Sequence, residues 1–322
     1  MPKVFVTREL PGGGVERLKQ HAEVSVWPDA DPPSRAELIE SLRGCDGAIV
    51  LITDRIDGEV LDANPQLRIV TTVAVGYDHI DVPAATERGV VITNTPGVLT
   101  ETTADHAFAL MLAYARRLVE GDNLVRAGQW PSWSPTFLLG RDVHSRTLGI
   151  VGLGAIGLAM ARRAKAFNMR VLYASRERKP DAERELGVEW RSFDDLLRES
   201  DYISLHVALT PETRNLIGAR ELALMKPDAV LINTARGPVV DEFALIDALK
   251  ARQIGGAALD VFHKETLMTD SPLVELDNVL LIPHVGSATI ETRGAMVDLC
   301  VDNLIAYFEG RPPLTPINPE VL

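Results

Sequence analysis

Short apolar runs rich in Val and Ile recur along the chain, separated by stretches with helical spacing of apolar residues. In the first third, these runs predict four strands, at Val4–Thr7, Gly47–Ile52, Ile69–Val73 and Val90–Thr93. Their nearly continuous hydrophobicity is typical of parallel strands covered on both faces. The intervening stretches predict helices at Gly14–Gln20 and Ser34–Leu42, the second of which opens with a Ser-x-x-Glu capping box.

The remainder of the chain repeats this alternation. Six further runs predict strands, at Thr147–Val151, Val171–Ala174, Tyr202–Leu205, Ala229–Asn233, Gly256–Leu259 and Val279–Ile282. Long helices are predicted at Ala104–Ala127, with Thr102 or Thr103 as the N-cap, and at Glu291–Glu309. Strands that alternate with helices in this way indicate doubly wound α/β layers with right-handed crossovers.

Length and charge narrow the class of protein. At roughly 150 residues per domain, 322 residues predict two domains. The chain has 33 Lys and Arg against 45 Asp and Glu, and its net charge of −12 argues against nucleic acid or an anionic membrane as a partner. Neither a signal-peptide pattern nor a membrane-spanning apolar run is found, so we expect a cytoplasmic protein. No cluster has metal-ligand spacing, and no metal is predicted.

A Gly-x-Gly-x-x-Gly motif gives the strongest chemical signal. Gly152, Gly154 and Gly157 follow one predicted strand and precede the helix-compatible run Leu158–Phe167. In this context the first glycine permits a tight turn, the second a close approach of a pyrophosphate, and the third close packing of helix on strand. The helix N-terminus then presents N–H groups to the phosphates. The motif predicts a dinucleotide site.

The end of the next strand predicts which dinucleotide binds. NAD-specific sites place an acidic residue about 20 positions after the glycines, where it bonds the ribose hydroxyls. Here that position holds Ser175, followed by Arg176. A serine can donate a hydrogen bond and an arginine can pair with a 2′-phosphate, so NADP(H) is preferred and NAD(H) is the alternative.

Three polar residues follow predicted strands in the second half, at Arg236, Glu265 and His284. Ligands of doubly wound sheets bind at the carboxyl ends of the strands. The three side chains are chemically complementary, because a guanidinium fork binds a carboxylate, an imidazole transfers a proton, and a carboxylate orients the imidazole. They are the candidate catalytic residues.

Several motifs, in order along the chain, resemble those of the D-isomer-specific 2-hydroxyacid dehydrogenase family, and most closely its glyoxylate/hydroxypyruvate reductase branch. The matching stretches are Val73–Asp81, Asn94–Gly97, Gly152–Gly157, Asn233–Gly237, Leu259–Phe262 and Pro283–Ser287. The resemblance implies two Rossmann-like, doubly wound parallel-sheet domains with a cleft between them. Residues 1–98 and 287–322 would form the substrate domain, and residues 99–286 the dinucleotide-binding domain.

The resemblance also assigns roles to residues. It makes Arg236, Glu265 and His284 the catalytic set. It also implies that the substrate is bound by six residues, Leu51, Val75, Gly76, Trp133, Arg236 and Ser287. It implies a homodimer in which an arm around Trp133 reaches the partner's substrate pocket. The implied cofactor-binding residues are Thr103, Gly152, Leu153, Gly154, Ala155, Ile156, Gly157, Ser175, Arg176, Thr234, Ala235 and Asp260.

The expected activity is NADPH-dependent reduction of small 2-oxo acids, such as glyoxylate and hydroxypyruvate, to D-2-hydroxy acids. One alternative is another activity of the family, such as phosphite dehydrogenase, although relatives with that activity carry Lys where this chain has Val75. The other is a non-catalytic protein that senses NAD(P)H, since fold alone does not settle function. We interpret His79, His106 and His206 as structural, and His106 in particular as helix packing.

Overall fold

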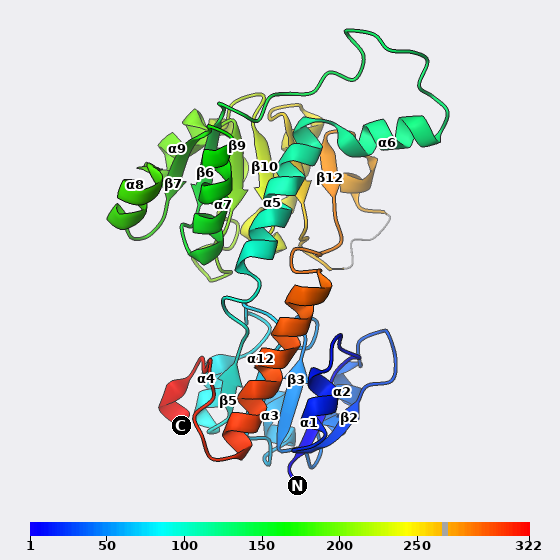
Figure 1. Ribbon diagram of the computed structural model, residues 1–322, viewed down its shortest axis with the longest axis vertical. Helices are drawn as coiled ribbons and strands as arrows, with labels where there is room; N and C mark the ends of the chain where they lie inside the picture. The colour runs from blue at the N-terminus through cyan, green and yellow to red at the C-terminus, as the bar shows by residue number, and fades with distance from the viewer. Residues whose placement is uncertain (266–269) are drawn as a thin grey trace. The chain divides into compact units, whose positions relative to one another are not determined.

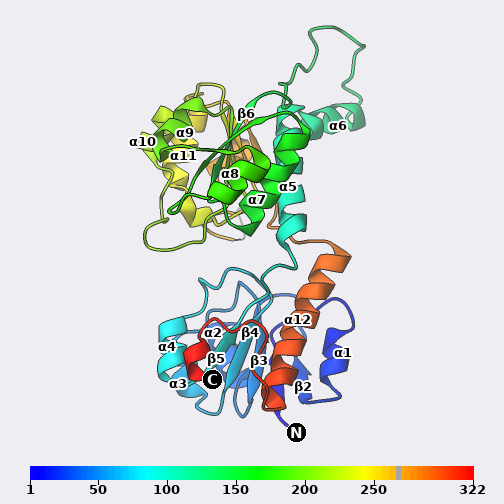
Figure 2. The same ribbon diagram turned by 60° about the vertical axis from the view of Figure 1, so that its left-hand side comes forward.

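The computed structural model describes residues 1–265 and 270–322, and the chain divides into two compact units. One unit combines Met1–Leu99 with Ser287–Leu322, and the other is Thr100–Gly286. Each contains a parallel sheet with helices on both faces (Figure 1, Figure 2). This confirms the predicted fold class of two doubly wound α/β domains.

The first unit has a sheet with the strand order β2-β1-β3-β4-β5. Helices α1 and α12 cover one face of this sheet, and α2, α3 and α4 cover the other. The elements are β1 (Lys3–Val6), α1 (Gly14–Leu18), β2 (Glu23–Val26), α2 (Arg35–Ser41), β3 (Gly47–Val50), α3 (Gly58–Ala63), β4 (Ile69–Thr72), α4 (Val82–Glu87), β5 (Val91–Thr93), α12 (Ile290–Phe308) and the 3-10 helix η3 (Pro319–Val321).

Helix α12 belongs to the core of the first unit although it comes near the end of the chain (Figure 1). Its fully buried residues Val297 and Leu304 pack with Val4, Ile49 and Ile69 of the sheet. Burying such side chains stabilises the fold by about 1.5–3 kcal/mol each. The two ends of the chain therefore share one core.

The second unit has a seven-stranded sheet with the order β12-β11-β10-β9-β6-β7-β8. Its helices are α5 (Thr100–Ala115), α6 (Leu118–Arg126), α7 (Ala155–Ala166), α8 (Pro180–Leu186), α9 (Phe193–Glu199), α10 (Ala219–Leu224) and α11 (Glu242–Lys250), with the 3-10 helices η1 (Gly237–Val239) and η2 (Pro272–Glu275). Its strands are β6 (Thr147–Val151), β7 (Arg170–Ala174), β8 (Glu189–Trp190), β9 (Tyr202–Leu205), β10 (Val230–Asn233), β11 (Gly256–Leu259) and β12 (Val279–Leu281).

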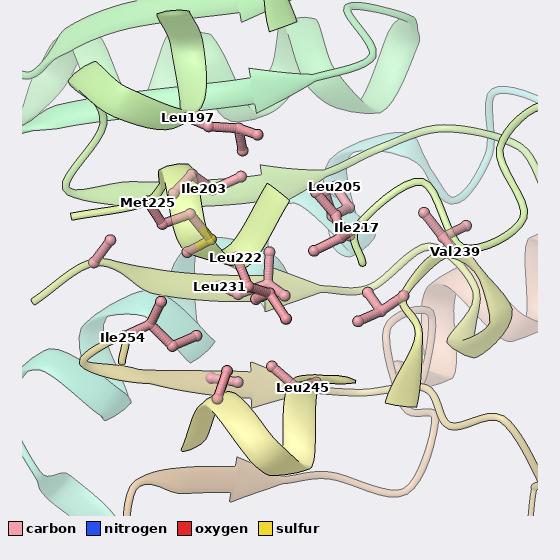
Figure 3. Packing of buried hydrophobic residues seen from close by; sticks show 14 of the residues in the cluster. Leu197, Ile203, Leu205, Ile217, Leu222, Met225, Leu231, Val239, Leu245 and Ile254 are labelled. Carbon is pink, nitrogen blue, oxygen red and sulfur yellow. The ribbon is translucent and has the colours of Figure 1, made fainter. Parts of the chain in front are cut away.

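Both faces of this sheet are buried. On one face, Ile203 and Leu231 of the strands pack with Leu222 of α10 and Leu245 of α11 (Figure 3). Helices α5, α7 and α8 cover the other face. The alternation of strand residues between two helical layers explains why the strands read as continuous apolar runs.

The prediction of one continuous helix over Ala104–Ala127 is wrong. The chain forms two helices there, α5 and α6, because Arg117 between them has a φ of +51°. Helix α5 begins at Thr100, so Thr102 and Thr103 lie inside it and neither is its N-cap. Among the described residues, no helix has the length and apolarity to cross a membrane.

Candidate active site

The glycine motif forms the turn between β6 and α7. Gly152 has a φ of +94°, and a Cβ there would lie 2.6 Å from the carbonyl oxygen of His206. A Cβ on Gly157 would lie 2.2 Å from the carbonyl oxygen of Gly152. Neither position has room for a side chain, so these glycines permit the tight turn and the close packing of α7.

The middle glycine faces open space instead. Gly154 is the N-cap of α7, and a Cβ there would meet no atom of the described chain within 4 Å. A pyrophosphate therefore has access to this backbone and to the first N–H groups of α7, and the loop fits a dinucleotide. The Leu153 side chain is buried, so that residue has only its backbone to offer, whereas Ala155 is exposed and Ile156 half-buried.

The loop after β7 holds three cations, Arg176, Arg178 and Lys179. Arg178 and Lys179 each pair with a nearby glutamate, at 2.8 and 3.4 Å. Arg176 is exposed, and the described ranges place no carboxylate at ion-pair distance from it. The Ser175 hydroxyl donates to the carbonyl oxygen of Glu177. Arg176 is thus the cation of this loop that no ion pair occupies.

Arg236 lies in a turn that the last residue of β10 holds in place. The Asn233 side chain donates to the carbonyl oxygen of Arg236 at 2.9 Å and accepts the N–H of Ala235 at 3.0 Å. Asn233 is fully buried and Arg236 is half-buried, with its Nη1 donating to the carbonyl oxygen of Ala235 at 2.9 Å. Thr234 and Ala235, both predicted to bind the cofactor, are the other residues of this turn.

The chain after Arg236 passes against the segment that leads to Glu265. A Cβ on Gly237 would lie 1.9 Å from the carbonyl carbon and oxygen of Phe262 and 2.5 Å from the amide nitrogen of His263. Only a glycine fits at this distance. The contact joins the loop after β10 to the loop after β11, a relationship that the sequence analysis missed.

His284 and Glu265 form a hydrogen-bonded pair. The Nδ1 atom of His284 lies 2.8 and 2.7 Å from the two carboxylate oxygens of Glu265. The two side chains are 26% and 33% exposed, so a ligand has access to them. With Nδ1 donating to the carboxylate, Nε2 on the opposite side of the ring is the nitrogen that can exchange a proton with a ligand.

Asp260 holds the turn that carries His284. Its carboxylate is almost fully buried and accepts the backbone N–H of Val285 at 2.8 Å and of Gly286 at 2.9 Å. Its carbonyl oxygen accepts the N–H of His284 at 2.9 Å. His284 has a φ of +50°, a left-handed conformation that is unfavourable for a residue with a Cβ. The Asp260 bonds compensate for that strain.

A comparison with known protein families shows which family the chain belongs to. The model described as "D-isomer specific 2-hydroxyacid dehydrogenase, NAD binding domain" matches residues 108–286. The chain belongs to the D-isomer-specific 2-hydroxyacid dehydrogenase family. It is therefore an NAD(P)-dependent oxidoreductase that acts on a CH–OH group.

Relatives of this dehydrogenase match along the whole chain. A glyoxylate reductase from Korarchaeum cryptofilum is 53% identical and one from Thermococcus litoralis is 51% identical, each over 100% of this chain and 97% or 98% of the relative. The structure is also similar to a solved NADPH-dependent glyoxylate/hydroxypyruvate reductase from Sinorhizobium meliloti in complex with NADP and malonate. That pair has a TM-score of 0.87 and 36% identity, with 99% of this chain and 97% of the other covered.

In this dehydrogenase four other predicted substrate residues, Leu51, Val75, Gly76 and Ser287, belong to the first unit. The Leu51 N–H donates to the Asp54 carboxylate at 2.8 Å. Val75 and Gly76 are half-buried in the turn after β4, where the Val75 carbonyl oxygen accepts the side-chain N–H of Asn94 at 2.8 Å. Ser287 is the first residue of the unit's second segment. Their roles in the dehydrogenase stay predictions.

Two other predicted residues differ sharply in exposure. Thr103 is 7% exposed inside α5, so little of its surface is available to a cofactor. Trp133 is 79% exposed in the loop between α6 and β6. The two roles assigned to them, cofactor binding and substrate binding, stay predictions.

His206 does not have the environment of a proton donor in this dehydrogenase. Its Nε2 lies 2.9 Å from the Ser204 hydroxyl, and its carbonyl oxygen packs on Gly152. Burial lowers the pKa of His206 to about 4, which keeps the ring neutral at pH 7. A structural role accounts for these contacts.

Proposed function

We propose that this dehydrogenase reduces glyoxylate and hydroxypyruvate to the corresponding 2-hydroxy acids with NADPH. The observation that carries the proposal is the bond of His284 Nδ1 to Glu265 at 2.7 Å, which presents Nε2 as a proton donor. Two relatives that are more than 50% identical over this whole chain are named glyoxylate reductases, and these names support glyoxylate as a substrate.

The three catalytic residues have different roles. When bound, the cofactor's reduced nicotinamide supplies a hydride to the keto carbon of the substrate. Arg236 binds the carboxylate of the 2-oxo acid with its guanidinium fork and stabilises the negative charge that develops. His284 holds a proton on Nε2 and gives it to the carbonyl oxygen as that oxygen becomes an alkoxide. Glu265 fixes the orientation of the ring and stabilises its positive charge.

The preference for NADPH rests on Arg176. Since Arg178 and Lys179 are occupied by glutamates, Arg176 is the cation of the loop that can pair with a 2′-phosphate. Ser175, unlike an acidic residue, does not repel that phosphate. An Arg–phosphate bond of about 1.5–3 kcal/mol corresponds to about a tenfold to hundredfold preference.

Steady-state kinetics test the reaction and the cofactor together. We expect turnover of glyoxylate and hydroxypyruvate with a higher kcat/KM for NADPH than for NADH. Arg176→Ala should reduce kcat/KM for NADPH and leave that for NADH, while Arg178→Ala serves as the matched control. A higher kcat/KM for NADH in the native enzyme contradicts the cofactor assignment. Oxidation of phosphite without reduction of either 2-oxo acid, or NADPH binding without any turnover, contradicts the reductase assignment.

The proposed enzyme is a homodimer that pairs through α6 and the loop after it. Helix α6 has no buried residue, and the segment projects from the second unit (Figure 2). Its large exposed apolar residues are Leu118, Val119, Val125, Trp130, Trp133, Phe137 and Leu139. Burial of this surface against a second copy would remove its apolar area from water. Sedimentation analysis should give a dimer, and a monomer at micromolar concentration contradicts the assignment.

A further inference from the structure

His106 contacts the residue that holds the His284 turn. It lies on α5 and places Nε2 3.2 Å from Oδ1 of Asp260, at ion-pair distance but without the alignment of a hydrogen bond. The His106 side chain is 18% exposed and that of Asp260 is 1% exposed. The two residues are 154 positions apart in the chain, so the fold rather than the local sequence brings them together.

The contact places a ring nitrogen that can carry a hydrogen beside a buried carboxylate. At 3.2 Å, the negative charge on Oδ1 of Asp260 attracts an N–H on His106. Asp260 accepts its two shorter bonds from backbone N–H groups, at 2.8 and 2.9 Å. An Nε2–H on His106 thus adds positive potential beside this buried carboxylate and helps to hold it in place.

Asp260 transmits this effect to His284. The backbone N–H groups of Val285 and Gly286 bond its carboxylate, and the strained residue His284 immediately precedes them. A Cβ on Gly286 would lie 3.1 Å from Oδ2 of Asp260 and 3.9 Å from Cδ2 of His106, so the turn packs closely on both side chains. If the carboxylate moves, the turn loses the acceptor that compensates for the φ of +50° at His284.

We propose that His106 is a positioning residue for the proton donor His284 and acts through Asp260. In this role His106 holds the Asp260 carboxylate in place, Asp260 fixes the turn, and the turn holds the His284 ring against Glu265. The inference rests on the proposed function for the catalytic role of His284. The contacts among His106, Asp260 and the His284 turn do not depend on that function. The next buried residues of α5, Ala107 and Phe108, are apolar. Packing on this helix therefore does not by itself require a ring nitrogen at position 106.

Variants of His106 test the inference in the full-length protein. His106→Leu removes the N–H and keeps an apolar side chain, and His106→Gln returns an amide N–H near the position of Nε2. His106→Asn carries an amide that is too short to reach Asp260, and it replaces the Leu variant if that variant does not fold. Met111→Leu, at a fully buried position of the same helix, is the control for altered packing.

The expected result is a selective loss of turnover. His106→Leu and His106→Asn should lower kcat about tenfold or more and shift its pH profile. KM for glyoxylate and Kd for NADPH should stay within about threefold of the native values, because Arg236 and the glycine turn are untouched. His106→Gln should recover most of kcat, and Met111→Leu should keep the native profile.

NMR of the His284 ring in the cofactor-free protein separates this inference from the proposed function. Displaced ring signals in His106→Leu or His106→Asn, restored in His106→Gln, support the positioning role even if glyoxylate is not a substrate. Native ring signals together with native kcat in a folded Leu or Asn variant overturn it while the reductase assignment stands. Equal losses of kcat in the Gln, Asn and Leu variants also overturn it, because they show a packing role.

Discussion

His284 and Glu265 lie 19 residues apart in the chain, and the Nδ1 of the histidine meets both oxygens of the carboxylate, at 2.7 and 2.8 Å. The loop of Glu265 follows β11 and the turn of His284 follows β12, and these strands are neighbours in the sheet. Parallel neighbours end at the same edge, so the two side chains meet without any distortion of the sheet.

Substitution of His284 should reduce turnover more than substitution of Glu265. His284→Gln removes the proton donor, and kcat for glyoxylate should fall about 10²- to 10⁴-fold with Kd for NADPH unchanged. Glu265→Gln leaves the donor but weakens its orientation, and the loss should be about 10- to 100-fold. Stopped-flow measurement of single turnovers reports both losses. Near-native kcat in His284→Gln excludes the histidine as the acid.

Asn233→Ala should impair both stability and substrate binding. The variant loses two buried hydrogen bonds, at 2.9 and 3.0 Å, and a cost of about 2 kcal/mol in unfolding free energy is expected. KM for glyoxylate should rise because the turn no longer fixes Arg236. Asn303→Ala is the control, since Asn303 is also fully buried and bonded but lies in the first unit on α12. A matching rise of KM in the control contradicts the specific role of Asn233.

Two glycines of the same motif should respond differently to alanine. Gly157→Ala places a Cβ 2.2 Å from a backbone oxygen, and unfolding free energy should fall by about 1–3 kcal/mol. Gly154→Ala meets no atom of the described protein within 4 Å, so Tm should be retained while Kd for NADPH rises. Denaturant titration and fluorescence binding measure the two effects. A native Kd in Gly154→Ala would falsify the pyrophosphate site at this residue.

His206 should make the folded state less stable in acid. The unfolded chain binds a proton at His206 near pH 6.5, but the folded chain does so only near pH 4. Unfolding free energy attributable to this group is therefore constant above pH 6.5 and falls as the pH drops from 6.5 to 4. The half-buried ring limits the loss to about 1–2 kcal/mol.

Urea denaturation at pH 7, 6 and 5 measures this effect. His206→Gln keeps a partner for the Ser204 hydroxyl and should show a smaller loss of stability between pH 7 and pH 5 than the native protein. His144→Gln, at an exposed position, should keep the native pH dependence. The same slope in the two variants means that other groups dominate the acid response.

The sequence predicted the buried central strands of both sheets, and it missed strands at the sheet edges and several of the shorter helices, such as α3 and α11. Continuous apolar runs identified the central strands, and the Ser34–Glu37 capping box is present at α2. Strand β2 was missed because its Glu-Val-Ser-Val sequence has only one partly buried residue, and β8 because it has two residues. The break between α5 and α6 was missed because Arg117, rather than a glycine, takes the left-handed conformation.

In the candidate site, the sequence predicted the local motif and missed the contacts between distant segments. Gly152, Gly154 and Gly157 carry a local motif, and the contacts around them agree with it. The contact of His106 with Asp260 has no local signal, and a histidine among the apolar positions of a helix reads as packing. The approach of Gly237 to Phe262 likewise depends on which strands are neighbours. Pairings between distant segments require the sheet order, which hydrophobic periodicity does not contain.

The composition of the first unit from both chain ends affects synthesis. A ribosome delivers residues 100–286 as one uninterrupted stretch, so the second unit can fold while translation continues. The sheet of residues 1–99 emerges earlier but lacks α12, which packs on Ile49 and Ile69. Those apolar side chains stay without their cover until α12 has been synthesised. Synthesis of the first unit therefore begins before that of the second unit and is completed after it, so its apolar side chains are exposed in the nascent chain in the meantime.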